Sequence, residues 1–529
     1  MTRRFYITTP IYYPNGEPHL GHVYTTVCAD VIARYHRLAG GRTWFLTGTD
    51  WHGIKMVKSA EEQKTTPQAL AEKNDQTFID FWKELGITND DYIRTSEPRH
   101  VKSVTEIVNR MLASGDIYLG SYEGWYDEGQ EEFITETEAK ANEFKSVVSG
   151  KPLGRYKEST YFFKLTKYVD RVFQAIESDQ IRVLPPSRKN EILSKLKGWN
   201  QDLSISRASL KWGIVMPNDP EHVLYVWIDA LSNYITALGL PGSTDDKDGN
   251  EAGEKDGKEA DKDLAAFWPA DVHLIGKEIL WFHAFYWPAM LMSLDLPLPK
   301  TLFAHGWWTS EGKKMGKSLG NFIDMDRLRA VNLTYSLDTL RYYLLRAAPF
   351  GSDLDWKETE LATAYAELGN VVGNLLNRTM NMITKYRDAK VPALGITEDR
   401  DAVLIKTLAD LPAAVAGAFA GLELQRAVLL PIEAARAVNT YIDQTQPFKL
   451  AKDPAQQKQL DTVLNLCAQG CKKVLAALLP ILPAKAAAGL AQMNVVLDGQ
   501  TIADLIGSDL PAGHQLGTAA VLFPRIETK

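Results

Sequence analysis

The chain has 529 residues, of which 45% are hydrophobic and 24% charged, a composition typical of globular proteins with roughly two to four domains. No run of 18 apolar residues occurs, so the sequence predicts no transmembrane helix. Three cysteines, Cys28, Cys467 and Cys471, are too few for a disulfide framework or a four-cysteine zinc site. We therefore expect a cytoplasmic protein without a membrane contact or a leader segment.

Negative charge is concentrated in one segment. The net charge is -7, and residues 242–263 alone hold 9 acidic residues against 4 lysines. Because the remainder is nearly neutral, a nucleic-acid partner would have to be bound by local basic patches. The same segment is nearly free of apolar residues, which predicts a solvated, flexible loop.

In chain order, strand-like runs alternate with helical patterns, which is typical of a parallel α/β sheet. The expected elements are strands at 5–9 and 43–46 with helices at 20–38 and 67–85, then strands at 272–275 and 302–304 with a helix at 280–292. An α+β insertion at roughly 113–224 would split this sheet. After about residue 357 alanine and leucine dominate, and long 3.6-residue periods predict a helical bundle.

Two short motifs could bind phosphates. Pro18-His19-Leu20-Gly21-His22 follows a strand and a turn and opens a helix, where backbone N–H groups and two imidazoles can donate to phosphate oxygens. Lys314-Met315-Gly316-Lys317-Ser318 places two ammonium groups in a loop after the second set of strands. Either motif alone is more often a surface turn, but the two together, in this order, favour a nucleotide site.

The paired motifs resemble the signatures of class I aminoacyl-tRNA synthetases, and five further blocks resemble methionyl-tRNA synthetases. These blocks lie at 11–16, 48–53, 226–230, 275–278 and 281–291. The resemblance implies a Rossmann-type parallel sheet split by a connective α+β insertion and followed by an all-α helical bundle. It divides the chain into the two halves of a catalytic nucleotide-binding domain (1–112 and 225–330), the insertion (113–224), a linker that contacts the tRNA stem (331–357) and an anticodon-binding domain with its tail (358–529).

By this resemblance the chain would activate L-methionine with ATP to methionyl-adenylate and transfer it to the 3′ end of tRNA(Met), releasing pyrophosphate and AMP. The reaction needs donors where charge accumulates on the phosphates, with Mg²⁺ accompanying ATP. Four residues would supply them as catalytic residues: His19, His22, Lys314 and Lys317. Four others would contact ATP: Gly21, Gly276, Glu278 and Ser318.

The resemblance also implies a methionine pocket, in which Asp50 would hold the substrate ammonium. The substrate side chain would lie among nine residues: Ile11, Tyr13, Trp227, Ala230, Leu231, Tyr234, Ile279, His283 and Trp287. An aromatic wall suits a thioether, since sulfur–aromatic contacts contribute roughly 0.3–1.5 kcal/mol. The alternative is that the apolar residues of this set are ordinary core.

Two residues in the bundle, Asn374 and Arg378, lie four apart on one expected helical face, and the family reads anticodon bases with an Asn and an Arg at this spacing. Phe448 stands where the family usually has a tryptophan and would stack on a base. The alternatives are a solvated polar stripe and a buried Phe448.

The sequence departs from the family at several points. Gly316 replaces a usual serine, and Glu278, one of the expected ribose contacts, replaces a frequent aspartate. No cysteine occurs around 124–129, so we expect a zinc-free insertion. No β-barrel is appended after residue 526, which favours a monomer.

Two other classes of function fit the sequence less well. Synthetases for leucine, isoleucine or valine carry an editing domain larger than this insertion, and the cysteine enzyme needs zinc ligands. A non-catalytic tRNA-binding relative would normally have eroded phosphate motifs, whereas both are present here.

Overall fold

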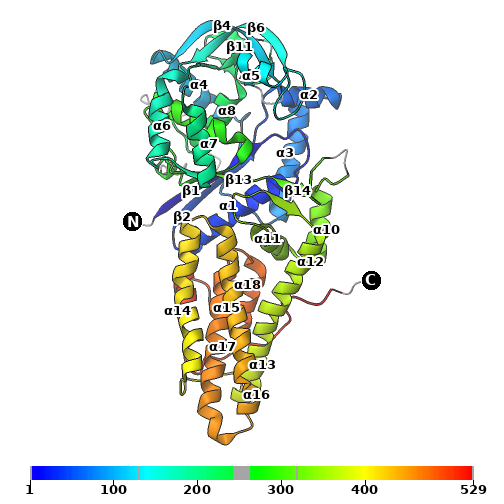
Figure 1. Cartoon of the computed structure of the whole chain (residues 1–529), viewed down its shortest axis with the longest axis vertical. Helices are drawn as coiled ribbons and strands as arrows, with labels where there is room; N and C mark the ends of the chain where they lie inside the picture. Colours follow the sequence, from blue (N-terminus) through cyan, green and yellow to red (C-terminus); the bar gives the residue numbers. More distant parts are fainter. Residues whose placement is uncertain (1–2, 129–131, 209, 242–262, 317–319, 527–529) are drawn as a thin grey trace, which may run out of the picture. The chain divides into compact units, whose positions relative to one another are not determined.

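The computed structural model describes residues 3–128, 132–208, 210–241, 263–316 and 320–526. The expected acidic loop, apart from Asp263, and the expected site residues Lys317 and Ser318 lie outside these ranges. The chain forms two compact units (Figure 1). We name Arg4–Pro18 with Thr43–His305 the sheet unit, and Met1–Arg3, His19–Arg42 and Gly306–Lys529 the helical unit.

The sheet unit is built on a six-stranded sheet with the order β3-β2-β1-β12-β13-β7. The strands are β1 (Arg4–Tyr12), β2 (Arg42–Thr49), β3 (Asp91–Arg94), β7 (Arg182–Leu184), β12 (Val272–Gly276) and β13 (Thr301–His305). The pairs β1–β12, β12–β13, β13–β7 and β2–β3 are parallel. Residues 5–9 of β1 are all buried, as expected for a parallel strand covered on both faces. The expected parallel α/β sheet and its four strands are therefore confirmed.

Helices connect and cover these strands. They are α2 (Ile54–Glu62), α3 (Pro67–Glu84), α4 (Pro98–Ala113), α6 (Val169–Glu177), α7 (Pro186–Leu196), α8 (Val226–Thr236) and α9 (Trp287–Ser293). The helix expected at 280–292 contains a π-helical turn, Phe282–Tyr286, directly before α9. Such turns are rare and frequently occur at functional sites.

The segment expected to be an insertion holds two small antiparallel sheets. One has the order β5-β4-β6-β8, from β4 (Ile117–Asp127), β5 (Glu132–Ile134), β6 (Gly154–Phe163) and β8 (Leu203–Ser204). The other joins β9 (Ser206–Arg207), β10 (Val215–Met216) and β11 (Asp219–Leu224). However, β7 lies within 113–224 and is an edge strand of the main sheet. The expected insertion is therefore not a separate module over its whole length.

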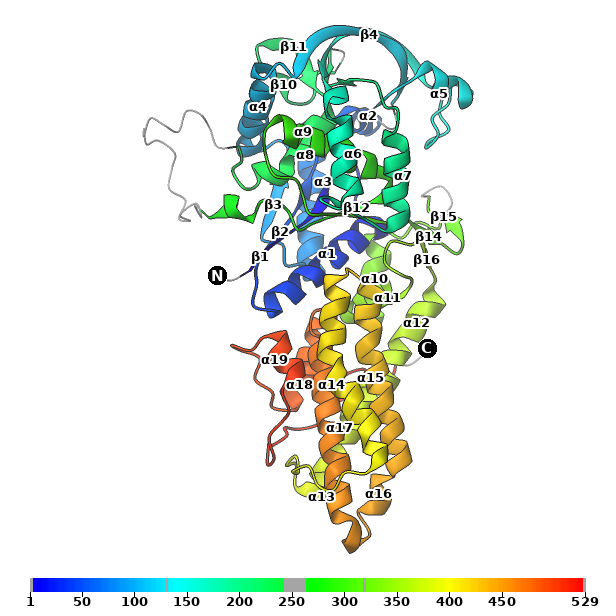
Figure 2. The ribbon, with the colours of Figure 1, turned by 60° about the vertical axis from the view of Figure 1, so that its left-hand side comes forward.

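The helical unit contains α1 (Leu20–Leu38), a small sheet and the expected bundle. The sheet joins β15 (Lys313–Lys314), β14 (Trp308–Ser310) and β16 (Leu354–Trp356), and α10 (Met325–Tyr335) and α11 (Leu337–Arg346) lie between β15 and β16 in the chain. The bundle comprises α12 (Glu358–Glu367), α13 (Asn374–Arg387), α14 (Asp399–Ala420), α15 (Leu424–Thr445), α16 (Pro447–Leu450), α17 (Gln457–Leu478), α18 (Pro483–Gln492) and α19 (Ile502–Gly507). In Figure 2, α14, α15 and α17 run side by side.

Among the described residues, α14 is the one helix long and apolar enough to cross a membrane by length and composition. The sequence alone did not indicate it, because acidic and basic residues interrupt the apolar run. Core helices of soluble proteins pass the same test, and α14 packs against α15 and α17. It is therefore weak support for a membrane span.

A buried ion pair joins α1 to the rest of the helical unit. Arg341 in α11 donates from Nη2 to Asp30 of α1 over 2.6 Å and from Nε to the carbonyl of Ile481 over 3.0 Å. Both charged side chains are fully buried. Because a buried charge without its partner is costly, this pair fixes the position of α1 within the unit.

Candidate active site

His19 and His22 form a reciprocal cap at the start of α1. The Nδ1 atom of His19 accepts from the N–H of Gly21 over 3.1 Å, and the Nδ1 atom of His22 accepts from the N–H of His19 over 3.4 Å. The two rings stack with centroids 3.7 Å apart. Because Nδ1 is an acceptor in both neutral rings, the proton of each lies on Nε2. The cap therefore orients two Nε2–H donors at a helix N-terminus, where anions bind favourably.

The environment keeps His22 neutral. Burial lowers the pKa of His22 well below its ordinary value, and the adjacent His19 lowers it further. Gly21 leaves space for the His19 ring, since a Cβ at this position would lie 3.1 Å from Cε1 of His19, closer than an ordinary contact. The motif therefore supplies neutral hydrogen-bond donors, with no bulk at Gly21.

The loop of the second motif is held by side chains that the sequence did not single out. Lys314, at the end of β15, is exposed. Asn321 spans the loop, because its Oδ1 accepts from the N–H of Gly316 over 3.0 Å and its Nδ2 donates to the carbonyl of Lys314 over 3.2 Å. Asp355 accepts from the N–H of Gly312 over 2.8 Å. Both described ends of the lysine loop are thus anchored.

The residues that follow the lysine loop contact the histidine motif within the helical unit. His19 forms an isolated antiparallel bridge with Asp324, and the N–H of Leu20 donates to the carbonyl of Ile323 over 3.1 Å. Phe322 packs edge-on against His19, with ring centroids 5.3 Å apart. The structure therefore joins two motifs that are almost 300 residues apart in the sequence.

In the sheet unit, several residues expected to bind methionine contact one another. The hydroxyl of Tyr234 donates to Nε2 of His283 over 2.7 Å, and Nδ1 of His283 donates to the carbonyl of Ile279 over 2.9 Å. Trp227 packs edge-on against His283 with centroids 6.0 Å apart, and Tyr234 lies 5.9 Å from Trp287. Burial lowers the pKa of His283 to about 4, so this ring is neutral at neutral pH.

Exposure divides the expected methionine residues into two groups. Four are partly exposed: Ile11, Tyr13, Trp227 and Ile279. Five are buried: Ala230, Leu231, Tyr234, His283 and Trp287. The structure thus brings together the aromatic part of the expected pocket, while the deeper residues also belong to the hydrophobic core.

Asp50 follows β2 and is buried at 3% exposure. Its Oδ1 accepts from the N–H of His52 over 3.1 Å and from the hydroxyl of Thr95 over 3.2 Å. Next to it lies Asp229 of α8, which accepts from His52 over 2.6 Å and from His100 over 2.7 Å. This network was not predicted, although Asp229 and His52 lie within two of the blocks that carry the family resemblance.

The network favours the charged forms of His52 and Asp229. Burial alone would raise the pKa of Asp229, but His52 and His100 lower it below its usual value. Burial alone would lower the pKa of His52, but Asp229, with a smaller contribution from Asp50, raises it above 6.5. Stabilisation by His52 is therefore complete below pH 6.5 and is lost as the pH rises through its raised pKa.

This linkage predicts a pH-dependent variant. We expect His52→Gln to lower the free energy of unfolding most below about pH 6.5, with a difference from wild type that shrinks as the pH rises. Urea denaturation followed by tryptophan fluorescence would measure it. In an Asp229→Asn background the pH trend should shrink to the smaller contribution of Asp50, and a trend of undiminished size there would contradict the pairing.

Among the described residues, Asp50, His52 and Asp229 are also the group whose ligand atoms lie within 4.8 Å of one another and could hold a metal ion. Hydrogen bonding between His52 and Asp229 already accounts for this cluster. The cysteines lie elsewhere, buried in α1 and α17, where burial raises the pKa of all three thiols. The expected lack of zinc stays a prediction.

The expected ribose contacts lie at the carboxyl end of β12. Gly276 is the last residue of this strand, and Glu278 lies two residues further on. The side chain of Glu278 is exposed and lies against Gly276, so that a Cβ at position 276 would overlap its carboxylate. In open parallel sheets ligands bind outside the carboxyl ends of strands. The glycine therefore leaves room for the carboxylate at this end of the sheet.

Of the expected anticodon residues, Asn374 and Arg378 lie on α13 and Phe448 lies on α16, and both helices pack against α17. Asn374 begins α13 directly after a π-helical turn, Leu368–Gly373, and Arg378 lies one turn further on. Arg378 donates to Asp443 of α15 over 2.7 Å. Phe448 is 51% exposed, so the alternative of a buried core phenylalanine is wrong.

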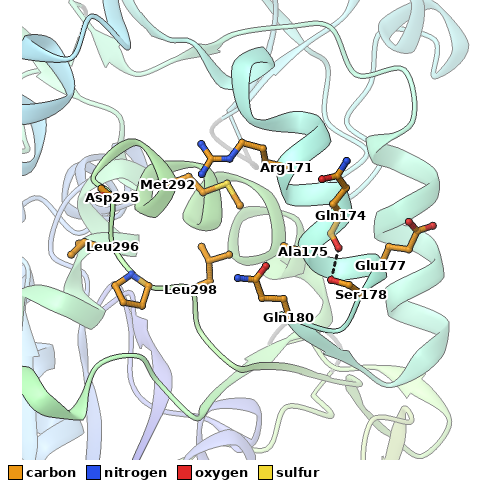
Figure 3. A pocket seen from close by; sticks show the side chains of 11 residues that line it. Arg171, Gln174, Ala175, Glu177, Ser178, Gln180, Met292, Asp295, Leu296 and Leu298 are labelled. Atoms are coloured by element: carbon orange, nitrogen blue, oxygen red, sulfur yellow. Dashed lines mark hydrogen bonds between the residues drawn. The ribbon is translucent and has the colours of Figure 1, made fainter.

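A cavity of 620 Å³ lies between α6 and residues 292–298 (Figure 3). Its lining includes Arg171, Gln174, Gln180 and Asp295, and none of the expected site residues. It therefore adds nothing to the expected nucleotide or methionine sites.

Comparison with known proteins gives consistent matches. A family model described as tRNA synthetases class I (M) matches residues 5–143 and 138–380. A methionine–tRNA ligase of Halalkalibacterium halodurans is 41% identical over 546 residues, covering 100% of this chain and 79% of the relative. One of Bacillus subtilis is 41% identical over 542 residues, covering 99% of this chain and 78% of the relative. The solved structure of Mycobacterium tuberculosis methionyl-tRNA synthetase with methionyl-adenylate superposes with a TM-score of 0.90 and 35% identity, covering 99% of this chain and 100% of that one.

Proposed function

Because the chain belongs to the tRNA synthetases class I (M) family, we propose that it activates L-methionine with ATP and transfers the methionyl group to tRNA(Met). The observation that carries this proposal is the reciprocal cap of His19 and His22, joined to the segment after the lysine loop in one unit. An eroded, non-catalytic relative would have no reason to keep this arrangement of phosphate-binding donors.

In the first step, the methionine carboxylate attacks the α-phosphate of ATP and pyrophosphate leaves. His19 and His22 donate Nε2–H bonds to the phosphates as negative charge accumulates, and Lys314 and Lys317 add positive charge. Mg²⁺ would accompany the departing phosphates. Gly276 and Glu278 contact the ribose, and Gly21 and Ser318 complete the ATP contacts.

In the same step, Asp50 holds the substrate ammonium and the aromatic residues enclose the thioether. The carboxylate of Asp50 already accepts two hydrogen bonds, from the His52 amide and Thr95, which fix its orientation before the substrate binds. In the second step a ribose hydroxyl at the tRNA 3′ end attacks the adenylate and AMP leaves.

The direct test is ATP–pyrophosphate exchange with each of the twenty amino acids. We expect exchange with L-methionine and only background with the others, because a thioether-sized aromatic pocket favours an unbranched side chain. A leucine-, isoleucine- or valine-dependent exchange would exclude the proposal. Binding of tRNA without any exchange would favour a non-catalytic role.

Anticodon recognition is proposed for Asn374, Arg378 and Phe448. The half-exposed ring of Phe448 offers a face on which a base can stack, and stacking contributes about 1–3 kcal/mol per base. The guanidinium of Arg378 could bind a base edge bidentately. The ion pair of Arg378 with Asp443 orients it and would be exchanged for a base on binding.

We expect Phe448→Ala and Arg378→Ala each to lower aminoacylation efficiency by roughly ten- to a hundred-fold and to leave ATP–pyrophosphate exchange unchanged. Both reactions would be measured on each variant, with a melting curve to check folding. Equal loss of both activities, or loss of neither, would remove the residue from the anticodon site.

A further inference from the structure

His273 is a fully buried histidine of β12 that lies among the aromatic residues of the expected methionine pocket. Its exposure is 0%, and its ring centroid is 4.2 Å from that of Tyr234 and 6.4 Å from that of His283. It has two hydrogen-bond partners: Nδ1 lies 2.7 Å from the hydroxyl of Thr8 in β1, and Nε2 lies 3.3 Å from Nε1 of Trp287. The family blocks do not include it, and no sequence pattern marked it.

The chemistry of the partners fixes the direction of both bonds. An indole N–H can only donate, so Nε2 of His273 accepts from Trp287. A neutral imidazole has one N–H, so Nδ1 of His273 donates to the Thr8 oxygen. Burial lowers the pKa of His273 well below its ordinary value, and His283 lowers it further, which keeps the ring neutral. One tautomer therefore satisfies the whole chain Thr8–His273–Trp287.

We propose that His273 is a positioning residue for methionine recognition, which holds the Trp287 indole in one orientation and is itself held by Thr8. The inference rests on the proposed function, in which Trp287 forms part of the methionine pocket. Two adjacent strands of the parallel sheet supply the support, because β1 and β12 pair with Thr8 opposite His273. The indole is thereby tied to two paired strands of the six-stranded sheet.

Structural indole bonds elsewhere in the sheet unit use other acceptors. The indole N–H groups of Trp199, Trp212 and Trp268 donate to backbone carbonyls, and that of Trp51 donates to the hydroxyl of Thr49. Burying an indole in this protein therefore does not require a histidine beside it. Leucine would fill the place of His273 without burying two ring nitrogens that must both be bonded. The histidine is better explained by the orientation that it imposes on Trp287.

The test compares His273→Leu, which removes both bonds, with His273→Gln, which keeps an acceptor for the indole. We expect His273→Leu to raise the KM for L-methionine in ATP–pyrophosphate exchange about ten-fold, the loss typical of one hydrogen bond. The KM for ATP and the kcat should change by less than about two-fold. His273→Gln should recover most of the affinity for L-methionine. Equilibrium dialysis with L-methionine alone should rank the three proteins in the same order of affinity: wild type, His273→Gln, then His273→Leu.

The matched control is His222→Leu. His222 is also a buried histidine of the sheet unit bonded to a hydroxyl, that of Ser206, but it has no contact with the aromatic cluster. The KM of the His222→Leu protein for methionine should stay at the wild-type value. Thr8→Val should raise the KM in the same direction as His273→Leu, and the double variant should be no worse than His273→Leu alone, since both act through one chain.

An unchanged KM for methionine in a folded His273→Leu protein would overturn the inference, as would an equal rise in His222→Leu. If His273→Leu does not fold, Thr8→Val decides by the same criterion. If the proposed function itself is wrong, the wild-type protein would show no methionine-dependent ATP–pyrophosphate exchange, which distinguishes that outcome from failure of this inference.

Discussion

Replacing Asp50 by asparagine should raise the KM for L-methionine by at least about 30-fold in ATP–pyrophosphate exchange. The carboxylate is 3% exposed, and removing one partner of a buried charge pair typically costs about 2–5 kcal/mol. Asparagine has nearly the same shape and can still accept from His52 and Thr95, so the local fold should persist. The KM for ATP should stay within about two-fold of wild type, because the proposed ATP contacts are other residues.

Asp75 provides the control for this experiment. It is another buried carboxylate of the sheet unit, which pairs with Arg94 and accepts from Tyr92, and it has no proposed role in methionine binding. Asp75→Asn should lower stability without a selective rise in the KM for methionine. A wild-type KM in a folded Asp50→Asn protein would exclude Asp50 as the ammonium partner.

The second large effect is expected at His22. His22→Ala should slow single-turnover formation of methionyl-adenylate by roughly a hundred-fold or more, because one preorganised donor to developing charge typically contributes about 2.7–4 kcal/mol. Methionine binding without ATP should not change. Rapid-quench measurement of adenylate at saturating substrates gives the rate directly.

The reciprocal cap makes this prediction more specific. Since the donor is a neutral Nε2–H, His22→Gln, whose amide can donate from a similar position, should recover part of the rate. Protonation of His22 should not contribute to the rate between pH 6 and 8, because its pKa is lowered well below 6.5 and the neutral ring persists above that pKa. A rate that falls as His22 loses a proton in this range would mean that the imidazolium is the active form.

Most of the architecture could be predicted from the sequence. Alternation of strand-like and helical runs predicted the parallel sheet, because strands buried on both faces are rich in aromatic and β-branched residues, as at residues 5–9. The 3.6-residue period of apolar residues predicted the helical bundle, since each helix must bury one face. The strand at β7 could not be assigned to the main sheet, because three residues carry too little pattern to specify their partner.

The candidate site likewise has features that are local in the sequence and features that depend on distant segments. Short motifs such as Pro18–His22 and the block with Asp50 are contiguous, so their chemistry could be proposed from residue type and spacing alone. Hydrogen-bond partners are set by packing between distant segments. Asn321 across the lysine loop, the link of His19 to Asp324, and the pairing of His52 with Asp229 therefore became evident only in the structure.

By itself, the sequence determined the fold class, the candidate phosphate-binding motifs and the family to which this chain belongs, because these depend on periodicity and on contiguous residue types. Only the tertiary structure decided which tautomers the histidines adopt and which charges are stabilised. The neutral His283 and the charged Asp229 differ because one is buried among aromatic rings while the other lies between two imidazoles. A side chain's protonation state is a property of its surroundings, and those surroundings come from segments far apart in the chain.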